Sequence, residues 1–205
     1  MSRKVILGSA SPRRRELLAQ IGARFEVRTS GREEVYHSTV PEEIVRELAI
    51  MKAENVAEDL ADEQGRTPED TIVIGADTIV VLDGKILGKP KDEKDAADMI
   101  GALQGRSHEV YTGVAILDYD ARGEKNVSVR AVGTKVYVNS MDEAEISAYI
   151  ATGEHMDKAG AYGIQGRFAA YIDRIEGDYY NVVGLPVSYV YQALKRLGAL
   201  CLSAD

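Results

Sequence analysis

One carboxylate lies where the sequence makes it costly to bury. Asp77 interrupts an apolar, β-branched stretch that runs from Ile72 to Leu82, and a buried charge needs a compensating partner. A metal ion, a basic partner or the task of a general base would each compensate for it, and all three are common at strand ends in α/β sheets. We therefore expect Asp77 at a strand end in a reaction site, with a hydrogen-bonded structural aspartate as the alternative.

A second group of residues has the pattern of an anion site. The apolar run Val5–Leu7 precedes a turn of small residues, Gly8–Pro12, and three arginines follow it, namely Arg13, Arg14 and Arg15. Backbone N–H groups and the positive end of a helix dipole favour anions at such a turn, and guanidinium groups can bind a phosphate bidentately. Cations at a helix N-terminus oppose the dipole, so a bound anion would offset their cost; a solvated basic helix start is the alternative.

Lysines supply further positive charge. Lys52 follows Val45 by seven residues and Leu48 by four, which places it on the apolar stripe of its helix, either projecting into a cleft or extending its ammonium group to solvent from the edge of the stripe. A predicted hairpin carries the others toward Asp77: Lys85, Lys89 and Lys91. The segment Gly84–Pro90 is not a phosphate-binding loop, because its spacing is one residue short and proline replaces the metal-binding serine or threonine.

Two acidic residues, Glu33 and Glu34, follow Gly31 and are the nearest other candidates for metal carboxylates, although a simple acidic loop explains the pair equally well. The three histidines have neither metal-ligand spacing nor a paired nucleophile, and we interpret them as structural or surface residues: His37, His108 and His155.

Alternating strand and helix patterns must position these side chains. Ser11 suits a helix N-cap before Pro12, so a helix is predicted to begin there. Further helices are predicted from a Thr39–Glu42 capping box to about residue 61, over residues 92–103, and after a Ser140–Glu143 capping box. A last strand is predicted over residues 180–183, and Pro186 starts the helix that follows it. Because hairpin signals are also present, the predicted class is α/β with a mixed twisted sheet and flanking helices.

Composition limits the function classes. The chain has 205 residues, and its 33 acidic residues outnumber its 25 basic ones to give a net charge of −8. This balance disfavours a general nucleic-acid binder. No apolar run approaches the roughly 18 residues that span a bilayer. Cys201 is the single cysteine, so an internal disulfide is excluded, and we expect a cytoplasmic protein without a membrane partner. A homodimer is left open, since homodimers are common among soluble proteins.

Five motifs occur in an order that resembles the Maf family. They are Gly8–Arg14, Leu48–Ala53, Gly75–Thr78, Gly88–Pro90 and Ala161–Gly166. Members are often named septum-formation inhibitors and are nucleoside triphosphate pyrophosphatases. The resemblance implies a single Maf-like domain over residues 1–205, with the fold of the Maf and inosine triphosphatase type, two lobes around a nucleotide cleft, and a divalent metal cation, Mg²⁺ or Mn²⁺.

The resemblance also implies roles for individual residues. Asp77 would be the proton acceptor and a metal ligand with Glu34, and Lys52 and Lys89 would be catalytic. The residues that would bind the nucleotide are Ser9, Arg13, Arg14, Thr78 and Gln165. One departure concerns Gly31–Glu34, where many members have Asp-Ile-Asp-Glu, so either Glu33 or Glu34 could be the metal carboxylate.

The implied substrates are dTTP and UTP, because Arg13, Thr78 and Gln165 resemble that type rather than the 7-methyl-GTP type. A side-chain amide such as that of Gln165 can pair with N3–H and a ring carbonyl of uracil or thymine, or when flipped with cytosine, so neighbours must fix its orientation. The alternatives are a broader activity on modified nucleotides and a nucleotide-binding regulator of cell division without turnover.

Overall fold

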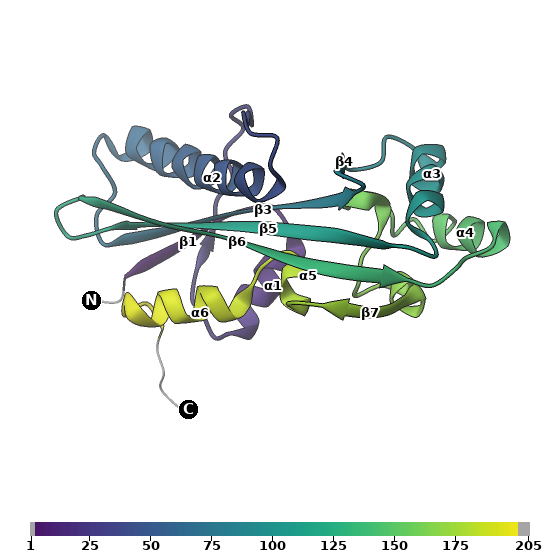
Figure 1. Cartoon of the computed structure of the whole chain (residues 1–205). Coiled ribbons are helices and arrows are strands. Elements are labelled where there is room, and N and C mark those ends of the chain that lie inside the picture. Colours follow the sequence, from purple (N-terminus) through teal and green to yellow (C-terminus); the bar gives the residue numbers. More distant parts are fainter. Residues whose placement is uncertain (1–2, 201–205) are drawn as a thin grey trace. The chain divides into compact units, whose positions relative to one another are not determined.

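The computed structural model describes residues 3–200 and alternates helices with strands (Figure 1). Its elements are β1 (Lys4–Gly8), α1 (Pro12–Gln20), β2 (Glu26–Val27), α2 (Pro41–Gln64), β3 (Thr71–Leu82), β4 (Lys85–Leu87), α3 (Glu93–Leu103), β5 (Ser107–Tyr119), β6 (Lys125–Val138), α4 (Glu143–Ile150), the 3₁₀ helices η1 (Ala159–Ala161) and η2 (Arg167–Tyr171), β7 (Ile172–Glu176), α5 (Tyr179–Val183) and α6 (Val187–Arg196). Cys201 lies outside the described residues.

Seven strands form one hydrogen-bonded sheet. The order is β2-β1-β3-β5-β6-β7, and β4 pairs with β3. Strand β1 is parallel to both β2 and β3, whereas β4 and β7 are antiparallel to their partners β3 and β6. The predicted mixed α/β class is therefore confirmed.

The chain divides into two compact units. The first takes in the described residues of Met1–Asp77, Thr112–Ala131 and Gly184–Asp205, and the second takes in Thr78–Tyr111 and Val132–Val183. Strands β3, β5 and β6 contribute residues to both units. The expected single domain over residues 1–205 stays a prediction.

The first unit packs α2 against one side of its strands, while Figure 1 places α6 on the other side. Small residues of α2 such as Ala49 and Ala53 are fully buried in this core, together with Ile6 of β1 and Val73 of β3. Helix α2 begins at Pro41 and ends before Gly65, whose φ of 66° is the left-handed conformation favoured at a helix C-terminus. No helix within residues 3–200 is long and apolar enough to cross a membrane.

The second unit has a core of its own. Ala96, Ile100 and Leu103 of α3 belong to one buried cluster with Tyr149 and Phe168. The aromatic rings of this core stack in tilted pairs with centroids about 5 Å apart. This unit therefore buries apolar surface independently of the first.

Two predicted helix caps are wrong. Helix α2 has Val40 rather than Thr39 as its N-cap, without a side-chain hydrogen bond, and the hydroxyl of Ser38 accepts a bond from the Val40 amide instead. Helix α4 has its capping box at Asp142 and Glu145, two residues after the predicted one. In α4 the predicted pair Ser140–Glu143 and the observed pair Asp142–Glu145 both match the capping-box pattern, so the pattern alone does not determine which pair caps the helix.

The predicted last strand over 180–183 is also wrong. These residues form the short helix α5, and the last strand is β7. The carboxylate of Asp178 accepts a hydrogen bond from the Tyr180 amide at 2.8 Å, an arrangement that starts a helical turn. Local capping therefore overrides the β-branched character of the segment.

Candidate active site

The turn after β1 is held by a buried arginine. The guanidinium of Arg14 donates to Ser9 Oγ at 3.0 Å and to the backbone oxygen of Gly184 at 2.8 Å. Ser9 and Arg14 are each only 8% exposed. Ser11 caps α1 as predicted, since its side chain accepts a bond from the Arg14 amide. The turn and the start of α1 are thus fixed to the segment that precedes α6.

Asp77 does not lie at a strand end. It is in the middle of β3, which runs without interruption through Gly75, Ala76 and Asp77. Its side chain is 14% exposed, and its Oδ1 lies 2.5 Å from Nζ of Lys52 on α2. The lysine therefore compensates for the buried charge, and the strand needs no break to accommodate it.

A second carboxylate approaches the same ammonium group. Glu34 Oε2 lies 3.1 Å from Lys52 Nζ, and the Glu34 side chain is half exposed. Of the two acidic residues that the sequence left open, the structure brings Glu34 to Lys52. Two carboxylates from separate segments thus converge on one cation, which is the arrangement expected of a site that handles charged ligands.

Close helix–strand packing, which the sequence pattern does not indicate, sets this geometry. A Cβ atom on Gly75 would lie 2.2 Å from the backbone oxygen of Ala49 and 2.7 Å from the backbone nitrogen of Ala53. Gly75 and Asp77 are two residues apart, so they face the same side of β3. Gly113 makes a similar close approach to Val45 of α2. The glycines let α2 lie directly on the strands, within reach of Asp77.

Charges near the turn act on one another. Burial lowers the pKa of the Arg14 guanidinium, and the positive charge of Arg13 lowers it further. The carboxylates of Asp77 and Glu34 act in the opposite direction and favour the charged form. Because arginine keeps its proton in proteins, this part of the first unit holds a buried positive charge beside two negative ones.

The other predicted site residues lie in the second unit. Thr78 follows Asp77 on β3 and faces the opposite side of the strand. Lys89 and Gln165 are exposed and lie in two segments that a backbone hydrogen bond joins, from Gly160 to Gly88 at 3.0 Å. The second unit thus brings the Lys89 and Gln165 segments together, while the first unit holds the remaining predicted residues.

The histidines lie as structural or surface residues, in line with their interpretation. His37 is exposed, and His108 and His155 are buried. Within the described part of the chain, no three or more His, Cys, Asp or Glu side chains are grouped so as to hold a metal ion.

Comparison with known proteins extends along nearly the whole chain. A protein named dTTP/UTP pyrophosphatase from Agathobacter rectalis is 50% identical over 95% of this chain and 98% of its own. Proteins of the same name from Pelotomaculum thermopropionicum and Dictyoglomus thermophilum are 48% and 47% identical, over at least 96% of this chain and 97% of their own.

A solved dITP/XTP pyrophosphatase from Mycobacterium abscessus aligns with 66% of this chain and 72% of its own, at 15% identity and a TM-score of 0.34. That likeness is too low to carry an argument about this chain. The family described as Maf-like protein, in contrast, matches residues 4–197. The chain therefore belongs to the Maf-like protein family.

Proposed function

We propose that this protein hydrolyses dTTP and UTP to the nucleoside monophosphate and pyrophosphate. The observation that carries the proposal is the contact of Asp77 with Lys52, which gives a largely buried carboxylate an ammonium partner beside a second carboxylate, Glu34. The names of relatives that are 47–50% identical to this chain over nearly its full length support the choice of substrate.

The proposed reaction is attack of water on the α-phosphorus. The oxygen of water forms a bond to phosphorus, the bond from phosphorus to the oxygen that bridges to the β-phosphate breaks, and pyrophosphate leaves. Asp77 accepts the proton of the attacking water. Lys52 fixes the direction of the Asp77 carboxylate through their 2.5 Å contact, which a general base requires.

Cations stabilise the charge that develops on the phosphates. Lys52, Lys89 and Arg13 supply positive charge, which acts more strongly where water is excluded. The turn after β1 adds backbone N–H groups at the start of α1. Within this turn Arg14 and Ser9 bind one another, so in our proposal they shape the phosphate site as well as bind the substrate.

The residues fit a divalent cation, Mg²⁺ or Mn²⁺. Glu34 and Asp77 already converge on the same positive group, and Mg²⁺ is commonly bound by one or two carboxylates together with substrate phosphates and water. When bound, such an ion neutralises phosphate charge and activates water. Glu34 and Asp77 are the side chains that would hold it.

Base selection is proposed for the second unit. The Gln165 amide can present a donor and an acceptor to uracil or thymine, and the backbone hydrogen bond between Gly163 and Gly166 fixes the loop around it. Thr78 is the other residue of the second unit that we assign to nucleotide binding. A mismatched donor or acceptor costs about 1–3 kcal/mol, which corresponds to about 5-fold to 150-fold in specificity. We expect at least about tenfold lower kcat/KM for CTP, ATP and GTP.

The test measures pyrophosphate release with dTTP, UTP, CTP, ATP and GTP, with and without Mg²⁺. We expect turnover of dTTP and UTP, and a loss of about 10²-fold to 10⁴-fold in Asp77→Asn with nucleotide binding kept within tenfold. Release of inorganic phosphate would refute the reaction, a preference for a purine would refute the role of Gln165, and more than about a tenth of the rate in Asp77→Asn would refute the general base.

A cytoplasmic location remains part of the proposal, and a homodimer is left open. The single cysteine fits a reducing compartment, and homodimers are common among soluble proteins generally. Fractionation of the source cells and light scattering of the purified protein would test the two points separately.

A further inference from the structure

The 28–40 segment, which leads from β2 to α2, has no helix or strand of its own. Its apolar side chains are not buried: Val35 is 46%, Tyr36 47% and Val40 47% exposed. Apolar packing therefore contributes little to its position. Because this segment carries Glu34, some other interaction must keep that carboxylate beside Lys52.

Polar contacts to α2 supply that interaction. The contacts run in order along the segment and in reverse order along the helix: Arg28 binds Glu63, Arg32 binds Asp62, Asp59 and Glu58, the Val35 amide donates to Met51 Sδ, and the His37 amide donates to Glu47. The segment thus lies antiparallel beside α2. Each contact fixes a different point of it on the same rigid helix.

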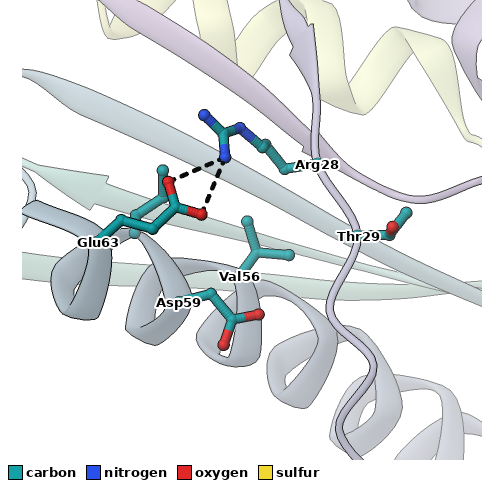
Figure 2. A pocket seen from close by; sticks show the side chains of 6 residues that line it. Arg28, Thr29, Val56, Asp59 and Glu63 are labelled. Atoms are coloured by element: carbon teal, nitrogen blue, oxygen red, sulfur yellow. Dashed lines mark hydrogen bonds and ion pairs between the residues drawn. The ribbon is translucent and has the colours of Figure 1, made fainter.

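Figure 2 shows the beginning of this arrangement. The Arg28 guanidinium reaches across to the Glu63 carboxylate, and both its bonds, of 3.0 and 3.1 Å, come from one nitrogen. Thr29 lies opposite Val56 and Asp59 of the helix. These side chains line a hollow of about 130 Å³, so apolar contact between the segment and the helix is incomplete here.

Arg32 makes the most extensive of these contacts. Its Nε lies 3.0 Å from Asp59 and its Nη2 3.3 Å from Asp62, while its Nη1 binds Glu58. Each guanidinium nitrogen thus has a different carboxylate. The planar guanidinium fixes the directions of all three bonds at once, which an ammonium group could not do.

We propose that Arg32 is a positioning residue that holds Glu34 beside Lys52; this inference rests on the function proposed above. Arg32 is two residues from Glu34, a span of at most about 7 Å of chain. Its partners and Lys52 belong to one continuous helix. Binding of Arg32 to the helix therefore restricts how far Glu34 can move from Lys52.

The contact is exposed enough to be dispensable for folding. The Arg32 side chain is 41% exposed, and ion pairs in such positions are screened by salt. Removal of the guanidinium should therefore loosen the segment without unfolding the protein. Arg28 offers a matched control, because it lies in the same segment and binds the same helix, but it has a single carboxylate partner and is six residues from Glu34.

The first experiment compares Arg32→Gln with Arg28→Gln by amide hydrogen exchange in the full-length protein without substrate. We expect exchange at residues 33–37 to increase about tenfold in Arg32→Gln and less than about twofold in Arg28→Gln. Equal effects of the two substitutions would overturn the proposal. This measurement needs no turnover, so its result is independent of the proposed reaction.

The second experiment is a double-mutant cycle of Arg32→Gln and Glu34→Gln, read out by kcat and KM for dTTP. If Arg32 acts through Glu34, the substitution Arg32→Gln lowers kcat about tenfold and changes KM less than about threefold in the wild-type background. In the Glu34→Gln background the same substitution changes kcat less than about twofold. Equal losses in both backgrounds would overturn the positioning role. If the wild-type protein releases no pyrophosphate, the proposed function fails, while the exchange experiment still decides whether Arg32 holds the segment.

Discussion

Substitution of Gly75 by alanine would act at the point where α2 lies closest to β3. The added Cβ would lie 2.2 Å from the backbone oxygen of Ala49, 2.7 Å from the backbone nitrogen of Ala53 and 2.9 Å from its Cβ. None of these atoms is the end of a flexible side chain. The clash can therefore be relieved only if the helix backbone or the strand moves.

The size of the movement follows from these distances. Real Cβ atoms essentially never approach other atoms closer than 3.0 Å, so α2 must retreat by about 0.8 Å from the strand at Ala49. Lys52 lies between the two contact points and would move with the helix, away from Asp77. Overpacking of this kind costs about 1–3 kcal/mol, and a displacement of about 1 Å in a reaction site can cost about 10²-fold in rate.

The assay measures the free energy of unfolding in urea and pyrophosphate release from dTTP. We expect Gly75→Ala to lose about 1–3 kcal/mol of stability and at least about tenfold in kcat. Gly101→Ala is the matched control, because Gly101 lies inside α3 with nothing within 4 Å of its added Cβ. That substitution should raise stability by about 0.5–1 kcal/mol. Wild-type stability and rate in Gly75→Ala would refute the packing argument.

Two further predictions concern buried polar groups. In Arg14→Lys the ammonium group cannot reach both Ser9 Oγ and the Gly184 oxygen, so the free energy of unfolding should fall by about 1.5–3 kcal/mol in urea; unchanged stability would contradict the anchoring role. Burial lowers the pKa of His108 from 6.5 to about 4, so the unfolded chain binds a proton as the pH falls through 6.5 while the folded protein stays neutral. Stability should therefore fall between pH 6.5 and 4, and His108→Gln should remove up to roughly 3 kcal/mol of that loss; an identical pH profile for this variant would refute it.

Much of the fold is predictable from local patterns. The apolar run Val5–Leu7, the Ser11 cap and the predicted hairpin that contains β4 each arise from a signal that lies within a few residues. The errors arise where two local signals compete. The Asp178 side chain starts a helical turn in a segment whose β-branched residues favour a strand, and the hydrogen bond to Asp178 is not visible in the residue pattern.

The site was predictable in composition but not in geometry. A charge within an apolar stretch is costly wherever its partner lies, so the sequence alone indicates Asp77. The partner, Lys52, is 25 residues away, and its approach depends on the close packing that Gly75 permits. Sequence patterns indicate which residues share one face of a helix or strand, and they do not predict contacts between elements that are distant in the sequence.

Helix α2 connects the parts of the site in the first unit. Its packing on Gly75 sets the distance from Lys52 to Asp77, and its acidic residues bind Arg32 close to Glu34. Both carboxylates that approach Lys52 are therefore placed with reference to the same helix. In contrast, the turn that contains Ser9 is fixed through Arg14 to Gly184, without a bond to α2 in that contact. A shift of α2 away from the sheet would thus carry Lys52 and the partners of Arg32 away from Asp77, which belongs to β3, whereas the hydrogen bonds of Arg14 with Ser9 and Gly184 do not involve α2 directly.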